Sequence, residues 1–142
     1  MIRVTADASV CLKWFLAGSP NELDSENAIS VLLAAREGRV LLMQPPHWRA
    51  EVAAVLARRE PKLALECVAD LLRVPGIRIV DSPTALLAAS QIAVETGEHV
   101  FDALYHALAM ECGATFITAD ERYLKRARAL GSIALLRNYE VE

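Results

Sequence analysis

The chain has 142 residues, 54% of them hydrophobic, and a formal net charge of −3. This length suits one compact domain spanning residues 1–142, and the negative charge argues against a general nucleic-acid coat protein, which is usually basic. No apolar run approaches the roughly 20 residues needed to cross a bilayer, and the first residues lack the pattern of a secretory signal, so we expect a cytoplasmic protein that does not enter a membrane.

Strands alternate with helices in the first half of the chain. Alternating and β-branched residues predict strands, and apolar residues at helical spacing predict the helices between them. Gly38 stops one predicted helix, and the Pro45-Pro46 pair opens the next. The predicted strands are 2–6 and 39–44, and the predicted helices are 8–17, 22–37, 46–59 and 62–73.

The second half continues the alternation. Pro75 and Gly76 break the chain before a strand, and Asp81 is expected to cap the helix that begins at Pro83. The predicted strands are 77–80, 114–118 and 132–136, and the predicted helices are 83–96, 101–112 and 120–130. Such alternation is typical of an α/β domain, so we expect three α/β/α layers with helices on both faces of a mainly parallel central sheet.

The cysteines and histidines form no metal-binding motif. Cys11, Cys67 and Cys112 are widely spaced with no CxxC, and we expect free, largely buried thiols in a reducing compartment. The histidines form no HExxH and no zinc pattern. We expect His106, four residues after Asp102, to be a surface or interface histidine.

Two aspartates follow predicted strands. Asp7 comes directly after strand 2–6, and Asp120 comes shortly after strand 114–118. Since ligands of parallel α/β sheets bind beyond the carboxyl ends of the strands, both side chains should lie at that edge. The alternative is structural, because an aspartate between a strand and a helix is a common helix cap. Asp81 has the same setting, and capping alone accounts for it.

Two further acids lie at the margins of apolar helix faces. Glu51 borders the apolar face of helix 46–59. Asp102 borders a stripe that we expect in the core, made of Phe101, Leu104, Tyr105 and Leu108. The alternatives are an ion pair of Glu51 with Arg58 or Arg59 and, for Asp102, a favourable interaction with the positive end of its helix.

Converging carboxylates call for a cation, because acids that meet without one repel each other and have raised pKa values. Mg²⁺ and Mn²⁺ prefer oxygen ligands, keep several waters, and are often held by a few carboxylates together with a substrate phosphate. The sequence has no P-loop and no GxGxxG motif, so nucleotide-cofactor binding has no support. Its acids favour Mg²⁺ or Mn²⁺ chemistry on a phosphate over a zinc site or a nucleophilic triad.

Four blocks of sequence, taken in order, resemble a known family. They read VTADASVCLKWFL, WRAEVAAVL, HVFDALYHALA and TFITADERYLKRA, and the resemblance covers nearly the whole chain. The order resembles the PIN-domain nucleases, and most closely the VapC-type toxins of toxin–antitoxin pairs. The acidic positions of the family fall on Asp7, Glu51, Asp102 and Asp120. The supporting hydroxyls of the family fall on Ser9 and Thr118.

The resemblance implies a Mg²⁺- or Mn²⁺-dependent endoribonuclease that acts as a toxin. Asp7, Asp102 and Asp120 would hold the metal, and Glu51 would act through a water molecule. The implied partners are an RNA substrate, a small antitoxin protein and a second copy of the chain in a homodimer. We expect cations beside the site to contact RNA phosphates, although a solvated helix face is the alternative for each. These candidates are Lys13, Arg49, Arg58, Arg122 and Lys125.

Two other functions compete with a nuclease. A phosphatase of the haloacid dehalogenase type also has an aspartate after its first strand, but it normally carries a second aspartate two residues later, where this chain has Ser9. The non-enzymatic alternative is an oligomerising or partner-binding α/β module whose acids only cap helices. Metal binding that depends on Asp7 and Asp102, and not on Asp81, separates these possibilities from a nuclease.

Overall fold

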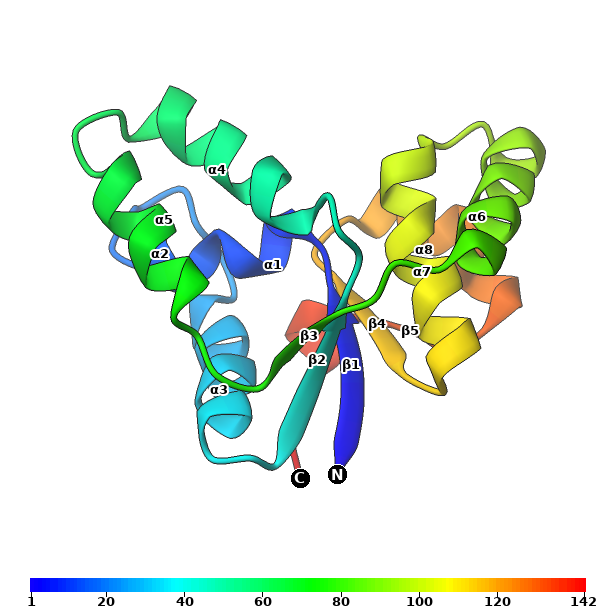
Figure 1. Ribbon diagram of the computed structural model, residues 1–142, viewed down its shortest axis with the longest axis horizontal. Helices are drawn as coiled ribbons and strands as arrows, with labels where there is room; N and C mark the ends of the chain where they lie inside the picture. Colours follow the sequence, from blue (N-terminus) through cyan, green and yellow to red (C-terminus); the bar gives the residue numbers. More distant parts are fainter.

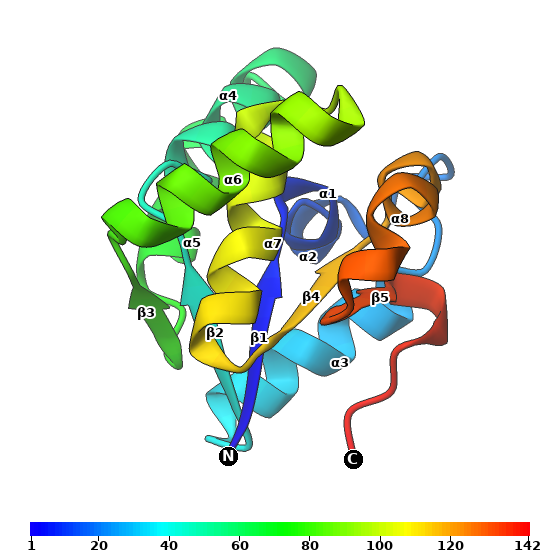
Figure 2. The same ribbon diagram turned by 90° about the vertical axis from the view of Figure 1, so that its right-hand side faces the viewer.

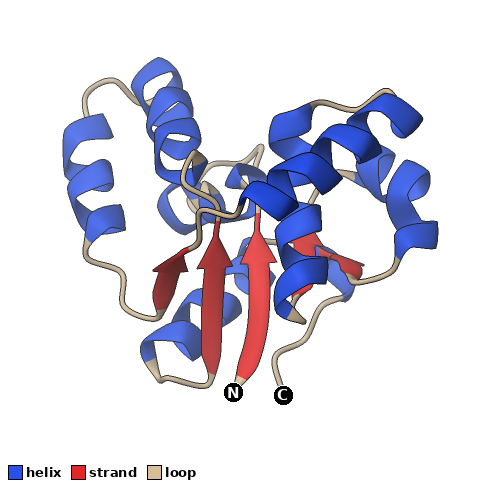
Figure 3. Ribbon diagram, turned by 45° about the vertical axis from the view of Figure 1, so that its right-hand side comes forward, coloured by secondary structure: helices blue, strands red, loops and turns tan.

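Five parallel strands form the centre of the protein (Figure 1). In the computed structural model, which describes residues 1–142, they lie in the order β3-β2-β1-β4-β5, and every neighbouring pair is parallel. The strands are β1 (Ile2–Ala6), β2 (Val40–Gln44), β3 (Ile77–Ile79), β4 (Thr115–Thr118) and β5 (Ile133–Leu135). Figure 3 shows the arrowheads of β3, β2 and β1 directed toward the same edge of the sheet. The expected parallel sheet is confirmed.

Helices cover both faces of this sheet, which confirms the expected three layers. Helix α7 packs against β1, β2 and β4, whereas α3 packs against β2, and Figure 1 shows these two helices on opposite sides of the strands. The helices are α1 (Ala8–Cys11), α2 (Lys13–Leu16), α3 (Ser25–Arg36), α4 (Trp48–Arg59), α5 (Ala64–Leu72), α6 (Pro83–Thr96), α7 (Val100–Cys112) and α8 (Glu121–Ala127), with 3-10 turns at Arg128–Leu130 and Leu136–Asn138. None of them combines the length and the apolar character that a membrane crossing requires.

The core is made of central strands and small helical residues. Val4, Phe116 and Ile117 of β1 and β4 are almost fully buried, because these strands are covered on both faces. Helix α6 lies across α7 (Figure 2). Buried alanines, among them Ala89 and Ala103, line their contact and let the two backbones approach closely.

The helices expected over 8–17, 22–37 and 46–59 differ from the structure in continuity or in where they begin. The single helix expected over 8–17 is two short helices that meet at Leu12, which keeps right-handed helical angles. Helix α3 begins at Ser25 rather than at residue 22, because Asp24 adopts a left-handed conformation with φ of 58°. The proline pair forms a turn, and α4 begins after it at Trp48. These differences leave the strand ends, and the acids that follow them, where the sequence predicts.

Candidate active site

Asp7 lies at the carboxyl end of β1, buried at the centre of the strand ends. Its carboxylate accepts hydrogen bonds from the Ser9 hydroxyl, from the backbone N–H of Val10 at 3.3 Å, and from the Thr118 hydroxyl at 2.6 Å. Burial raises the pKa of Asp7 to about 6, while the Ser9 and Thr118 hydrogen bonds pull that pKa down. The carboxylate of Asp102 raises it further. Asp7 is therefore a desolvated carboxylate held by three donors.

Asp120 lies at the end of the neighbouring strand β4 and caps α8, where its Oδ1 accepts a hydrogen bond from the Tyr123 N–H at 3.1 Å. Two hydroxyls join this strand end to the first. Thr118 Oγ1 accepts from the Asp120 N–H at 3.0 Å while it donates to Asp7, and Ser9 Oγ accepts from the Ala119 N–H at 3.3 Å. Ser9 and Thr118 thus connect β1 to β4 immediately around the two aspartates.

Asp102 stands in the first turn of α7 and is half-buried. Burial raises its pKa, the carboxylates of Glu51 and Asp120 raise it further, and His99 opposes them. Because Asp102 also raises the pKa of Asp7, it interacts electrostatically with all three of the other acids. The four predicted acids therefore share one region at the carboxyl edge of the sheet.

Glu51 reaches this region from the first turn of α4, and two contacts hold that turn in place. The Trp48 indole N–H donates to Cys11 Sγ at 3.1 Å, which ties α4 to α1. His47 Nε2 lies 3.2 Å from Glu51 Oε2 and 3.2 Å from the carbonyl oxygen of Phe101 on α7. The alternative ion pairs of Glu51 are not formed, since Arg59 pairs with Glu22 at 2.9 Å.

The donors around this region are oxygen atoms, which suits Mg²⁺ or Mn²⁺ better than a softer metal. They do not form a closed cage, because no group of three or more His, Cys, Asp or Glu side chains is placed to hold a metal ion. An open arrangement fits a cation that retains several waters and is held by one or two carboxylates directly. The crowding of carboxylates around Asp102 also favours a cation.

Comparison with known proteins now identifies the family. The model of the PIN domain matches residues 4–130. This chain belongs to the PIN domain family. The sequence resemblance to PIN domains is therefore confirmed. No curated protein of similar sequence was found.

Solved structures with the same fold include the toxin VapC20 and several complexes bound to DNA. VapC20 of Mycobacterium tuberculosis, a toxin that cleaves the sarcin–ricin loop, is 18% identical with a TM-score of 0.65, over 90% of this chain and 95% of that one. A DNA-bound VapBC complex from Salmonella typhimurium is 15% identical with a TM-score of 0.65, over 96% and 99%. PAE2754 from Pyrobaculum aerophilum is 18% identical with a TM-score of 0.62, over 96% and 92%. At these identities the likeness concerns the fold.

Of the three aspartates that follow strands in this PIN domain, two cap a helix and the third does not. Asp7 and Asp120 both cap helices, as the structural alternative predicts. The expectation for Asp81 is wrong, because the cap of α6 is Ser82, whose hydroxyl accepts from the Ala85 N–H at 3.1 Å. Asp81 is exposed, so the aspartate that seemed best explained by capping does not cap.

Two buried polar groups near the acids were not predicted from the sequence. The buried Gln44 side chain, at the end of β2, forms two hydrogen bonds with the backbone of Ala6, of 2.8 and 3.0 Å, immediately before Asp7. Tyr105 is also fully buried, and its hydroxyl has no hydrogen-bond partner. Burial and the nearby Glu51 carboxylate raise the pKa of Tyr105. The role of Gln44 could have been predicted, because it is a polar residue at the end of an otherwise apolar strand. In contrast, nothing in the sequence distinguishes Tyr105 from an ordinary core residue.

Two further expectations are wrong. His106 is buried rather than at the surface; its ring lies 3.0 Å from the Tyr123 hydroxyl and 2.7 Å from the carbonyl oxygen of Gly131. It therefore braces the helix that follows Asp120 instead of pairing with Asp102. Phe101, expected in the core, is 64% exposed, because α7 turns this position away from the sheet.

The five predicted RNA-binding cations fall into two groups. Lys13 is buried and paired with Glu22 at 2.9 Å, so its charge is already balanced. The other four are exposed, and one of them, Arg122, lies 3.8 Å from Glu98. These four are Arg49, Arg58, Arg122 and Lys125.

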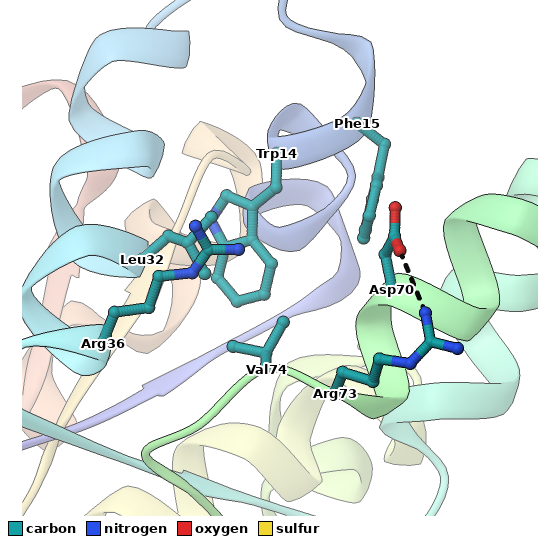
Figure 4. Close-up of a pocket in the computed structure, with 7 residues that line it drawn as sticks. All are labelled: Trp14, Phe15, Leu32, Arg36, Asp70, Arg73 and Val74. Atoms are coloured by element: carbon teal, nitrogen blue, oxygen red, sulfur yellow. Dashed lines mark ion pairs between the residues drawn. The ribbon is translucent and has the colours of Figure 1, made fainter.

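A hollow of about 430 Å³ lies elsewhere, between α2, α3 and α5 (Figure 4). Trp14, Leu32 and Val74 line it, and Asp70 pairs with Arg73 at 3.6 Å on its rim. None of the four acids lines this hollow. It is therefore separate from the candidate active site.

Proposed function

We propose that this PIN domain is a Mg²⁺- or Mn²⁺-dependent endoribonuclease and acts as the toxin of a toxin–antitoxin pair. The observation that carries the proposal is the convergence of Asp7, Glu51, Asp102 and Asp120, from four different elements, on one edge of the sheet. A purely structural role does not explain why these acids gather, because each carboxylate destabilises the fold when other carboxylates are near. VapC20, which shares the fold, is a toxin that cleaves RNA at the sarcin–ricin loop.

In this proposal the residues have distinct roles. Asp7, Asp102 and Asp120 would hold the cation, one or two of them directly and the rest through its waters, and Ser9 and Thr118 keep Asp7 oriented. When bound, the cation activates water and offsets the charge that develops on the phosphate oxygens. Glu51 accepts a proton from the attacking water. The water oxygen bonds to phosphorus as the bond from phosphorus to the 3′ oxygen breaks, and the departing 3′ oxygen takes a proton from solvent, which leaves a 5′-phosphate and a 3′-hydroxyl.

Substrate approach depends on the exposed cations around this acidic region. Arg49 and Arg58 lie on α4, and Arg122 and Lys125 lie on α8, so both helices offer positive charge to a phosphate backbone. Contacts of this kind position a strand without reading its sequence and weaken with added salt. Single-stranded or looped RNA is the expected substrate, since proteins usually read unpaired bases.

Partner binding is the second part of the proposal. Solved structures with this fold include VapBC complexes from Salmonella typhimurium and Rickettsia felis, each bound to DNA. Leu63, Leu65 and Leu72, in and beside α5, are at least half exposed, and exposed leucines on one helix are typical of a protein contact. These residues support a small antitoxin, or a second copy of the chain, as a partner.

A cleavage assay tests the proposal. Purified protein is incubated with single-stranded RNA in Mn²⁺ and, in parallel, in EDTA, and Asp102→Asn is compared with Asp24→Asn, an exposed aspartate whose left-handed backbone asparagine also adopts readily. We expect cleavage by the native protein and Asp24→Asn in Mn²⁺ alone, and at least a roughly 100-fold lower rate in Asp102→Asn. Equal rates in the two variants would overturn the site, and no cleavage by any of them would favour a non-catalytic module.

A further inference from the structure

A second, smaller hollow lies directly beside the acids. It has a volume of about 150 Å³ and opens between the turn before α4, the start of α6 and the outer side of α7. Leu86 of α6 and Leu104 and Leu108 of α7 make its floor apolar. Phe101 and His47, which also line it, neighbour Asp102 in sequence and Glu51 in space. None of the four acids lines the hollow, but His47 and Phe101 join its rim to Glu51 and Asp102, so it adjoins the proposed catalytic region.

One wall of this hollow is an exposed aromatic surface. Phe101 leaves 64% of its surface in solvent, although an aromatic ring loses favourable burial there. The His47 ring lies beside it, with ring centroids 5.1 Å apart and planes inclined by 31°. The contact of His47 with the Phe101 carbonyl, at 3.2 Å, holds the two residues together. The exposed ring of Phe101 is therefore held in place beside the hollow by His47.

The lining of the hollow also includes a carboxylate. Asp81 lines it and is exposed, and its carboxylate is free of helix capping because Ser82 performs that role. No hydrogen bond or ion pair within the protein occupies the Asp81 side chain, whereas Ser82 is bonded to Thr84 and Glu111. A free carboxylate facing an apolar floor accepts hydrogen bonds from an N–H donor and repels anions.

We propose that this hollow binds one unpaired nucleobase of the RNA, next to the phosphate that is cleaved, with Phe101 stacking on the base and Asp81 accepting from its amino group. The inference rests on the proposed nuclease function and adds its base-binding subsite. An aromatic wall, an apolar floor and one hydrogen-bond acceptor match a planar ring with polar edges, and unpaired bases are commonly stacked on aromatic side chains. The volume of about 150 Å³ suits one ring system.

Steady-state cleavage of short single-stranded RNAs tests this subsite, with Phe101→Ala compared to Leu87→Ala. Leu87 is an exposed apolar residue on α6 that does not line the hollow. We expect KM to rise about tenfold in Phe101→Ala and to stay unchanged in Leu87→Ala. A tenfold rise lies in the low to middle part of the range expected for the loss of one base–aromatic stacking contact. Phe101→Tyr should restore the native KM, because tyrosine keeps the stacking surface.

The role of Asp81 is tested by base preference. RNAs that differ only at the base beside the cleaved bond are compared, with cytosine or adenine replaced by uracil, which lacks an amino group. Asp81→Ala, which removes the acceptor, should reduce the preference of the native protein for the amino-bearing bases at least several-fold, while the affinity for Mn²⁺, measured by calorimetry without RNA, stays native.

The outcomes separate the two levels of the proposal. If the native protein fails to cleave RNA in Mn²⁺, the proposed function itself is wrong. If it cleaves, and Phe101→Ala retains the native KM and base preference, the subsite is wrong while the function stands. A change of oligomeric state in Phe101→Ala, measured by light scattering, together with a native KM, would show that this surface contacts protein and would also overturn the subsite.

Discussion

Asp7 and Asp81 occupy the same local setting, each between a parallel strand and a helix, and the structure uses them in opposite ways. Asp7 follows β1, which has β2 and β4 on its two sides, so a neighbouring strand end supplies the Thr118 hydroxyl and buries the carboxylate. Asp81 follows the edge strand β3 and remains exposed. The position of a strand within the sheet, rather than the residues around the aspartate, decides which aspartate is buried at the proposed catalytic region.

The largest expected effect concerns catalysis. Asp7→Asn should lower the rate of Mn²⁺-dependent RNA cleavage by at least about 100-fold, because a carboxylate that holds a catalytic cation contributes several kcal/mol. Asp24→Asn serves as the control, since it removes an exposed aspartate outside the site. A native cleavage rate in Asp7→Asn would contradict the proposal that Asp7, unlike Asp81, takes part in catalysis.

Stability of the metal-free protein should depend on pH through Asp7. Its pKa is about 6 in the folded chain against an ordinary value of 3.8, so between these values the folded form holds a proton that the unfolded form has released. The free energy of unfolding therefore falls by roughly 3 kcal/mol as pH rises from 4 to above 6.

Urea denaturation in EDTA at several pH values measures this term. Asp7→Asn removes the titrating group and should lose the pH-dependent decline that it causes, whereas Asp81→Asn should keep it. Identical pH profiles for the native protein and Asp7→Asn would contradict the assignment of the buried, raised-pKa carboxylate to Asp7.

The threonine hydroxyls near Asp7 and near Asp81 should also differ in how much they stabilise the folded protein. Thr118→Val deletes a 2.6 Å hydrogen bond to buried Asp7 and should cost about 2 kcal/mol of unfolding free energy at pH 7.5, since bonds to charged groups are worth about this much. Thr84→Val, at the exposed end beside Asp81, deletes a bond to the surface residue Glu111 and should cost less than about 0.5 kcal/mol. Equal losses of unfolding free energy in Thr118→Val and Thr84→Val, measured by thermal or urea unfolding, would contradict the difference between the surroundings of Asp7 and Asp81.

The smallest effect concerns the hydroxyl of Tyr105, which lies near Asp7 and has no counterpart at Asp81. Because this hydroxyl is buried without a partner, Tyr105→Phe should raise the unfolding free energy of the metal-free protein by about 1 kcal/mol. Tyr123→Phe, which removes a hydroxyl that contacts His106, should lower it by a similar amount. A loss of stability in Tyr105→Phe would show that its hydroxyl has a partner in solution.

The fold was predictable from the sequence because periodicity and turn residues act locally. Each of the five strands lies within a residue or two of its predicted range, and Gly97 and Gly113 end their helices in the left-handed conformation expected there. The start of α3 was not predictable, because residues just before it depend on a tertiary ion pair between Glu22 and Lys13.

The acids were predictable as a set, and their surroundings were not. Asp7 and Asp120 follow strands whose ends meet in any parallel sheet of this order. In contrast, the exposure of Phe101 and the burial of His106 depend on how α7 rotates against the sheet and on its contacts with α8. Helical spacing gives the relative angle between side chains, but it does not give the rotation of the whole helix.

Calorimetric titration of the native protein, Asp7→Asn and Asp81→Asn with Mn²⁺ tests the central claim most directly. The account predicts that the native protein and Asp81→Asn bind Mn²⁺ with equal affinity, and that Asp7→Asn binds it at least about tenfold more weakly. Equal Mn²⁺ affinity in all three proteins, or a loss in Asp81→Asn alone, would contradict the assignment of the metal-binding site to the carboxyl end of β1.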